Sequence, residues 1–480
     1  MRIKAQLGGR IRALRRQAGL TQAALAERLG ISTSYVNLLE NDRRAVTADL
    51  LLSLAQVLDV DLRSLAAGPD EQLLADAMEV FGDPVLEEQP LTAADVRSLV
   101  ESHPEAVRSV VHLHQAYSAA RSTAELLQAQ VLDDPDLLYG ARVADRARLS
   151  SEQVTDFLQR HSNHFPELES AAERVWAAAQ LAGTDLFGGM ARYLEARHGA
   201  TVRVTPMSAM DGAVRRYRQA RGDLLVSEAL ARSSRSFQLA VQIGLLECPD
   251  LLASLVAGPE LPTDEARSIG RLALANYFAA ALLMPYDRFL AAAESERYDI
   301  AVLCHRFDIG WEQVCHRFTT LRRPGAEGVE FFFIRVDPAG NISKRLSAAG
   351  VHIPRFSGLC TLWNVQLALL QPGRVSVQLA ELPDGRRVLC IARTVQRHVG
   401  GFHTPRVVYA VGIGCASADA RRLVYSDGLD LDSTEPVPIG ITCRLCERVS
   451  CQARAFPSLH QPIRLDENVR GLSFYDAPGS

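Results

Sequence analysis

The strongest constraint on the fold lies near the N-terminus, in two short segments that each begin with a hydroxyl residue. Thr21 precedes the segment 22–29, Gly30 interrupts it, and Ser32 precedes the segment 33–40. A hydroxyl residue before a helical segment and a glycine after it are common signals for the start and the end of a helix. Two short helices joined by a glycine-containing turn, the second polar on its outer side, predict a helix-turn-helix.

The distribution of charge indicates which partner this module binds. The chain of 480 residues has a net charge of −4, yet residues 1–50 carry nine Arg or Lys against four acidic residues. Residues 70–90 are acidic by contrast. Such asymmetry is typical of a small phosphate-facing module attached to a larger body.

Residues 1–68 resemble the lambda-repressor/Cro (Xre-like) DNA-binding domain. In that family the third helix enters the major groove and the start of the second contacts the DNA backbone. The same fold can also serve as a protein adaptor, but the basic first helix and the Arg43-Arg44 pair favour double-stranded DNA. The resemblance implies base-facing roles for Thr33, Ser34, Tyr35 and Asn37, and phosphate or groove-edge contacts for Gln22, Arg43 and Arg44. The motifs that carry it are Arg12-x-x-Arg15, Gly19-Leu20-Thr21-Gln22-x-x-Leu25-Ala26, Gly30-Ile31-Ser32 and Tyr35-Val36-x-x-Leu39-Glu40.

A helical linker is expected over residues 69–149. Its pattern is helical from Thr92 to Gln130, with an interruption at Pro104. A helix with one apolar stripe after a DNA-binding module fits a homodimer seam, and it fits packing against its own domain equally well. The stripe consists of Val107, Val110, Val111, His114, Tyr117 and Leu127.

Residues 150–310 are expected to form an α+β domain that resembles a peptidase without its metal. The run Ala275–Pro285 is similar to a signature of ImmA/IrrE-type zinc metallopeptidases. That family needs an H-E-x-x-H helix and a later acidic ligand. Here the upstream segment 236–247 carries Val241-Gln242-Ile243-Gly244-Leu245, and Leu274 stands at the later acidic position. The pair His161-x-x-His164 lacks a nearby glutamate and is interpreted as structural. A pocket reused for binding is therefore expected instead of catalysis.

Residues 311–480 are expected to form a second α+β domain that carries a cysteine cluster. Strand-like stretches occur at 329–336, 375–382, 387–393 and 407–413. Cys443, Cys446 and Cys451 lie within nine residues, and Cys360 is our candidate for a fourth ligand. Four thiolates suit structural zinc or an iron–sulfur cluster, and their spacing does not separate the two.

The whole order resembles the short-chain fatty acyl transcriptional regulator family. The resemblance rests on Phe278–Pro285, Val314–Leu321 and Cys443–Pro457 and covers nearly the full chain. It implies control of acyl-metabolism genes, an acyl-coenzyme A effector in the central domain, and an iron–sulfur cluster rather than zinc. A coenzyme A ester needs cations for its phosphates and an aromatic or apolar slot. The candidates by position are Arg197, Arg271, Tyr277 and Arg306.

The sequence thus predicts a multidomain, DNA-binding transcription regulator that is not an enzyme. No stretch approaches 18 consecutive apolar residues and no apolar signal segment is found, so we expect a cytoplasmic protein without a membrane partner. A regulator whose cluster senses redox state is the alternative. A repressor-cleaving metallopeptidase is disfavoured because the metal-binding motif is replaced.

Overall fold

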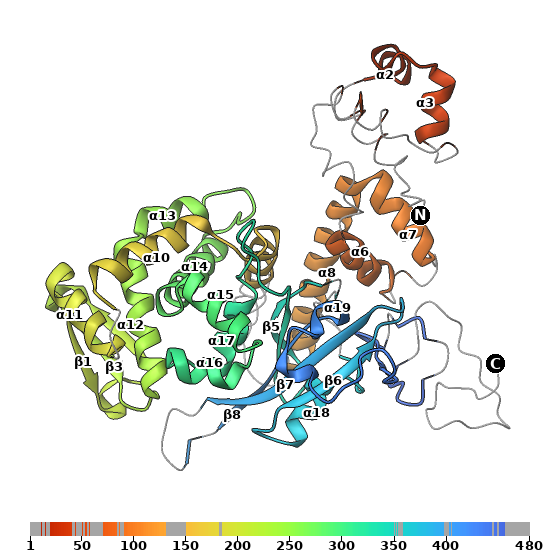
Figure 1. Cartoon of the computed structure of the whole chain (residues 1–480). Coiled ribbons are helices and arrows are strands. Elements are labelled where there is room, and N and C mark those ends of the chain that lie inside the picture. Colours follow the sequence, from red (N-terminus) through yellow and green to blue (C-terminus); the bar gives the residue numbers. More distant parts are fainter. Residues whose placement is uncertain are drawn as a thin grey trace. The chain divides into compact units, whose positions relative to one another are not determined.

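The structure, a computed structural model, forms two compact units, residues 1–125 with 443–480 and residues 126–442 (Figure 1). None of the described helices combines the length and the apolar composition that crossing a lipid bilayer requires. The described residues are 11, 15, 20–40, 44, 50, 53, 54, 57, 71–83, 86, 91–130, 150–181, 185–349, 351, 353, 359–397, 403, 404, 406–443, 446–448 and 451–456.

The N-terminal part of the first unit is helical and has two separate cores. Ile11, Leu25, Ala26, Val36 and Leu54 form the first core, around α2 and α3. The second core joins α6, α7 and α8, and the expected helix break at Pro104 is confirmed because α7 ends at Ser102 and α8 begins at Pro104. The helices are α2 (Gln22–Leu29), α3 (Thr33–Glu40), α6 (Glu71–Phe81), α7 (Ala93–Ser102) and α8 (Pro104–Gln130).

Helix α8 buries only part of the apolar stripe that the sequence suggested. Val107 and Val111 are buried in the core with α6 and α7. Val110, Leu113 and Tyr117 are exposed, and Leu113 keeps 71% of its surface accessible. Residues three and four apart share one side of a helix, so part of the predicted stripe packs against α6 and α7 while the rest of it is exposed.

The second unit begins with a helical layer around a small sheet. A helical segment over residues 150–160 precedes α10, and a larger sheet follows α17. The strands β1 (Thr201–Thr205), β3 (Asp223–Ser227) and β2 (Arg215–Arg218) form the small sheet in that order, with β1 parallel and β2 antiparallel to β3. The helices are α10 (Pro166–Ala178), α11 (Leu186–His198), α12 (Arg232–Glu247), α13 (Pro249–Leu255), α14 (Asp264–Leu283), α15 (Tyr286–Ser295), α16 (Ile300–Phe307) and α17 (Trp311–Phe318).

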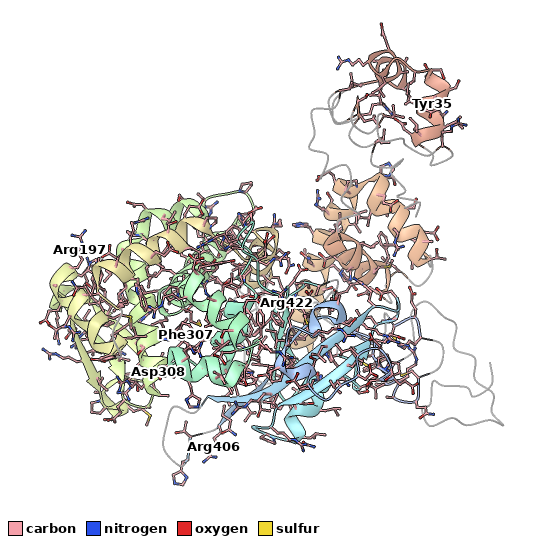
Figure 2. All side chains as sticks on the ribbon, in the orientation of Figure 1. Tyr35, Arg197, Phe307, Asp308, Arg406 and Arg422 are labelled. Carbon is pink, nitrogen blue, oxygen red and sulfur yellow. The ribbon has the colours of Figure 1, made fainter. Side chains whose placement is uncertain are left out.

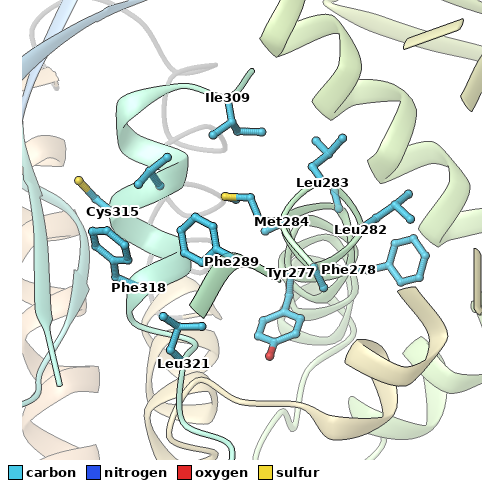
Figure 3. Packing of buried hydrophobic residues seen from close by; sticks show 14 of the residues in the cluster. Tyr277, Phe278, Leu282, Leu283, Met284, Phe289, Ile309, Cys315, Phe318 and Leu321 are labelled. Atoms are coloured by element: carbon cyan, nitrogen blue, oxygen red, sulfur yellow. The ribbon is translucent and has the colours of Figure 1, made fainter. Parts of the chain in front are cut away.

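A tight break separates α16 from α17 between Phe307 and Trp311. Asp308 adopts a left-handed conformation with φ of 49° and caps α16. The turn brings α17 back against the apolar core, in which the rings of Phe289 and Phe318 lie 5.6 Å apart. Figure 3 shows this core, where side chains of α14 and α17 meet.

The larger sheet has six strands in the order β5-β4-β8-β7-β6-β9 and separates two apolar cores. Alternate residues of β4 point to opposite faces of the sheet. Phe333 joins the core that the sheet shares with the helices, while Phe332 and Ile334 join a second core on the other face. Every pair is antiparallel except β6 with β9. The elements are β4 (Phe332–Val336), β5 (Ile342–Leu346), α18 (Asn364–Leu367), β6 (Ser376–Glu381), β7 (Arg387–Arg397), β8 (Val407–Ala416), α19 (Ser417–Ala420) and β9 (Val437–Pro438).

The architecture confirms the expected fold class. A helix-turn-helix comes first, and helical layers with two mixed sheets follow. The four expected strand segments of the C-terminal region all contain a strand, with β7 extending four residues further than expected, to Arg397.

Candidate DNA-binding surface and ligand pocket

The helix-turn-helix is fixed by its caps and by its small core. The side-chain oxygen of Thr21 accepts a hydrogen bond from the backbone N–H of Ala24 at 3.1 Å. Gly30 ends α2 with φ of 66°, a conformation that costs glycine little because it has no Cβ. Buried Leu25 and Val36 then hold α3 against α2.

The outer face of α3 carries the base-facing candidates. Thr33, Ser34 and Asn37 are exposed, and Tyr35 is half-buried (Figure 2). The guanidinium carbon of Arg44 lies 5.7 Å from the centre of the Tyr35 ring. Polar side chains on an exposed helix with a nearby arginine can contact base edges and phosphates.

Gln22 joins the two helices of the motif. Its amide nitrogen donates to Glu40 at 2.7 Å, and Arg15 donates to the same carboxylate at 2.5 Å. Glu40 is buried, so these hydrogen bonds stabilise its charge. The amide of Gln22 thus has a structural partner within the module. Its contact with the DNA phosphates or the groove edge stays a prediction. Arg43 lies outside the described residues.

The positions of the lost peptidase motif are filled by core packing. Val241 and Gln242 on α12 and Leu274 on α14 are buried. A Cβ on Gly244 would lie 2.7 Å from a ring carbon of Phe278, so glycine permits the close approach of the two helices. In the described part of the chain, no three His, Cys, Asp or Glu side chains come together as a metal site.

A buried ion pair joins α10 to α17. Arg317 donates to the two carboxylate oxygens of Glu169 at 2.6 and 2.9 Å, and Tyr277 donates to Glu169 at 2.6 Å. Burial alone would raise the pKa of Glu169, but Arg317 and Tyr277 outweigh it and hold that pKa below its ordinary value. Burial together with Glu169 raises the pKa of Tyr277. This geometry places Tyr277, a predicted ligand contact, inside a structural network.

The two histidines of the H-x-x-H pair lie beside this network. His161 contacts the backbone oxygen of Phe157 through Nδ1 at 2.9 Å, and its ring stacks on Phe165. Nδ1 of His164 lies 3.4 Å from the hydroxyl of Tyr277, and burial lowers the pKa of His164. Both rings therefore have packing partners in the core.

A pocket of about 470 Å³ is lined by residues of α10, α11, α14, α15 and α16. It combines two arginines with aromatic and apolar side chains, and the guanidinium carbon of Arg288 lies 5.1 Å from the centre of the Trp176 ring. Arg306 lines the pocket and also donates to Glu296. The lining residues are Trp176, Leu181, Leu186, Leu283, Arg288, Ala291, Ala292, Ser295, Arg306 and Phe307.

Of the four predicted ligand contacts, only Arg306 is among the lining residues of this pocket. Arg197 on α11 lies 3.9 Å from Glu247, and Figure 2 shows it in a different part of the unit from Phe307. Arg271 on α14 donates to Ser268 at 3.3 Å. The sequence reasoning missed Trp176 and Arg288. One available signal was that Arg288 lies three residues after Pro285, the last residue of the Leu283-Met284-Pro285 motif.

The cysteine segment is organised by an arginine. Arg454 donates to the backbone oxygen of Cys443 at 3.1 Å and to that of Cys446 at 3.4 Å. Cys443 and Cys446 are buried, and Cys451 is half-buried. The backbone N–H of Cys360, which lies in the second unit, donates to Ile441 at 2.9 Å.

Three protein-family models match the chain in succession. The helix-turn-helix model matches residues 11–65, and the IrrE N-terminal-like domain matches residues 195–319. The short-chain fatty acyl coenzyme A regulator C-terminal model matches residues 320–475.

Characterised proteins and a solved structure are similar over long stretches. The HTH-type transcriptional regulator PrpR of Mycobacterium tuberculosis is 40% identical, over 96% of this chain and 94% of that protein. The propionyl-CoA carboxylase regulator of Cereibacter sphaeroides is 41% identical, over 98% of this chain and 99% of that protein. A solved Mycobacterium tuberculosis transcriptional regulator aligns with a TM-score of 0.65 and 41% identity, over 68% of this chain and 99% of that one.

Proposed function

Because this chain belongs to the family of short-chain fatty acyl coenzyme A regulators, we propose that it is a cytoplasmic DNA-binding transcription regulator whose DNA affinity responds to a short-chain acyl-coenzyme A. The observation that carries the DNA-binding part is the outward face of α3, with exposed Thr33, Ser34 and Asn37. We propose that its regulated genes are those of acyl or carboxylate metabolism, by similarity to the propionyl-CoA carboxylase regulator.

The pocket lined by Arg288 and Arg306 is our proposed effector site. Its volume falls within the range of about 300–1,000 Å³ that small-molecule sites occupy. Two arginines can bind phosphate groups, while Trp176 and Phe307 supply aromatic surface for an adenine or an acyl chain. This choice keeps Arg306 from the sequence-based candidates and adds Arg288.

Regulation then follows from linkage between the two sites. An effector that binds one conformation of the protein more tightly than another shifts the population toward that conformation. If this conformation also differs in DNA affinity, DNA and effector affect each other's binding by the same factor.

A homodimer is the proposed functional assembly. The exposed residues Val110, Leu113 and Tyr117 of α8 follow the 3-4 spacing of a coiled-coil seam, and the same spacing continues in the sequence at Ala120, Ala124 and Leu127. Two copies joined along this seam would present two helix-turn-helix modules to a symmetric operator, with half-sites about one helical turn apart or a multiple of that.

The cysteines remain candidates for an iron–sulfur cluster, with zinc as the alternative. Thiolates are the right donors for either metal centre. The described residues do not bring three of Cys360, Cys443, Cys446 and Cys451 together. We therefore assign no step of the response to the cluster. Iron and sulfide content of anaerobically purified protein, with and without Cys446→Ser, tests this candidate.

The decisive experiment is a DNA titration of the anaerobic protein with its own upstream region, with and without acetyl- or propionyl-coenzyme A. We expect the acyl ester to change DNA affinity, and Arg288→Ala with Arg306→Ala to abolish that change while leaving ligand-free affinity intact. Arg160→Ala, an exposed arginine outside the pocket, is the control. DNA binding that no acyl ester alters would refute the effector role. If Arg197→Ala or Arg271→Ala abolished the acyl-coenzyme A effect and the pocket variants did not, the effector site would be assigned to Arg197 or Arg271 instead of the pocket.

A further inference from the structure

The small sheet of the second unit concentrates positive charge. Residues 201–222 contain five arginines and one aspartate, although the whole chain has a net charge of −4. These residues form β1, β2 and the segments that connect them to β3. Such a local excess of cations is the electrostatic footprint of a surface that meets a polyanion.

The strand register places Arg203, Arg216 and Arg218 on one face of this sheet, whereas Arg215 pairs with Val226 and lies on the other face. Arg203 of β1 and Arg216 of β2 both pair with Leu225 of β3, so these residues form one row across the sheet. The next row on the same face contains Arg218 opposite Asp223. Side chains two residues apart on a strand share a face, so the two rows lie on the same side.

The opposite face of the sheet is covered by the core of the unit. Its central row consists of Val202, Leu224 and Tyr217, which pack into the main apolar cluster. Figure 1 shows β1 and β3 at the margin of the unit, next to α11 and α12. The arginine rows therefore lie on the outer face.

The outer face keeps its positive charge accessible. Arg203 and Arg221 are exposed, and the side chains of Arg216 and Arg218 are 41% and 34% exposed. Two acidic residues lie within this group. Asp223 accepts hydrogen bonds from Arg218, and Asp211 lies 3.3 Å from Arg216. Four arginines against two carboxylates leave an excess of positive charge.

The chemistry of the face favours nucleic acid backbone as the occupant. The exposed residue Thr201 on β1 adds a hydroxyl beside the arginines. Arginine and threonine side chains are frequent donors to phosphate oxygens. Because neighbouring strands lie about 4.8 Å apart, β1 and β2 place their arginines roughly 10 Å apart across β3. Duplex DNA carries about one charge per 1.7 Å of its axis, so several phosphates fall within that span.

We propose that the outer face of the β1-β3-β2 sheet binds the phosphate backbone of duplex DNA outside the segment read by α3. This inference rests on the proposed DNA-binding function. It extends the DNA contact of the chain to a second, sequence-independent surface, which contributes affinity and salt dependence but no base preference.

The test compares two DNA fragments over a range of salt concentrations. One is the upstream operator trimmed to its minimal bound sequence, and the other adds about three helical turns on each side. The triple variant Arg203→Gln, Arg216→Gln and Arg221→Gln removes the charges without touching the Arg218–Asp223 pair. The control replaces three exposed arginines elsewhere, Arg160, Arg386 and Arg421, by glutamine.

We expect the wild-type chain to show a steeper salt dependence on the long fragment than on the short one. Each phosphate contact contributes about 0.9 to the magnitude of the slope of log affinity against log salt. The triple variant should therefore lower the magnitude of this slope by roughly 2 to 3, and only on the long fragment. The control should keep the wild-type slopes. Unfolding temperatures verify that each variant is folded. If the triple variant is unstable, the double variant Arg203→Gln with Arg221→Gln replaces it in the salt titration.

Equal slopes for the wild type and the variant on the long fragment would overturn the inference, and an acidic protein would become the better partner for this face. Failure of the proposed function gives a different result. In that case the wild-type chain shows no preference for its operator on either fragment, and Asn37→Ala changes nothing.

Discussion

On α3 the helical period assigns each side chain to one of two surfaces. Val36 and Leu39 are buried, while Thr33, Ser34 and Asn37 are exposed. This separation could be predicted from the sequence, because residues three and four apart share a face of any helix. The hydrogen-bond partner of a buried polar group could not be predicted from the sequence. Tyr277 donates to a carboxylate 108 positions away, and no local pattern indicates that contact.

Replacing Asn37 by alanine should weaken operator binding by about 1–3 kcal/mol if its amide contacts a base. Binding to a scrambled duplex should not change. Arg44→Ala is the contrasting variant, because loss of a phosphate contact weakens binding to both duplexes and lowers the salt slope by about 0.9. Competition anisotropy with both duplexes measures the two effects. An Asn37→Ala protein that loses affinity equally for both duplexes would contradict the base-reading role.

At the scale of helices, α10 and α17 are joined by a charge pair with almost no access to water. Arg317 is fully buried and Glu169 is 3% exposed. Removing one partner of such a pair leaves an uncompensated charge in the core. The sequence does not show that the arginine of α17 points inward.

Glu169→Gln should lower the free energy of unfolding by about 3–5 kcal/mol at pH 7. The pKa of Glu169 in the folded protein lies below its ordinary value of 4.5. Its stabilising contribution is therefore complete above that value and is lost as the pH falls through the folded pKa. Urea unfolding of both proteins should show their difference narrowing in acid. Glu173→Gln, which removes a half-exposed carboxylate from the same helix, is the control and should have a small effect.

The contact between α12 and α14 depends on the absence of a side chain at Gly244. Gly244→Ala would place a methyl group 2.7 Å from Phe278, so we expect a loss of about 1–3 kcal/mol in unfolding free energy from overpacking. Gly258→Ala is the control, because a Cβ there meets no atom within 4 Å. Thermal unfolding compares the two. Equal stability of both variants would mean that the helices separate without cost.

At the scale of the whole molecule, the sequence predicts the order of the parts better than their functional surfaces. The helix-turn-helix and the loss of peptidase ligands can be seen in local motifs. The pocket cannot be predicted in this way, because its lining comes from α10, α11, α14, α15 and α16, and only the folded chain brings Trp176 to Arg288. The extent to which the α8 stripe is buried also required the structure, since the spacing alone does not separate buried Val107 from exposed Val110.

Leu113→Glu should separate the proposed dimer without unfolding the chain, because this side chain is 71% exposed within its own protomer. A charge at a seam position of each copy places two like charges together. Sedimentation analysis should show monomers, and operator affinity should fall and depend on protein concentration. Ser122→Glu places the same charge on α8 outside the seam positions and should remain dimeric. A dimeric Leu113→Glu protein would exclude this seam.

The strand order also determines when each part is finished during synthesis. The core of the helix-turn-helix uses residues up to Leu54 and Val57, whereas the larger sheet gains its edge strand only when Val437 pairs with Ala380. Roughly 380 residues are translated in between, which takes about 20–75 s at about 5–20 residues per second. During this time the ribosome carries a module with a finished DNA-reading helix and an incomplete sheet. The proposed dimer seam lies on α8, which ends at Gln130, so two such modules would be able to pair on DNA before the effector pocket and the larger sheet are complete.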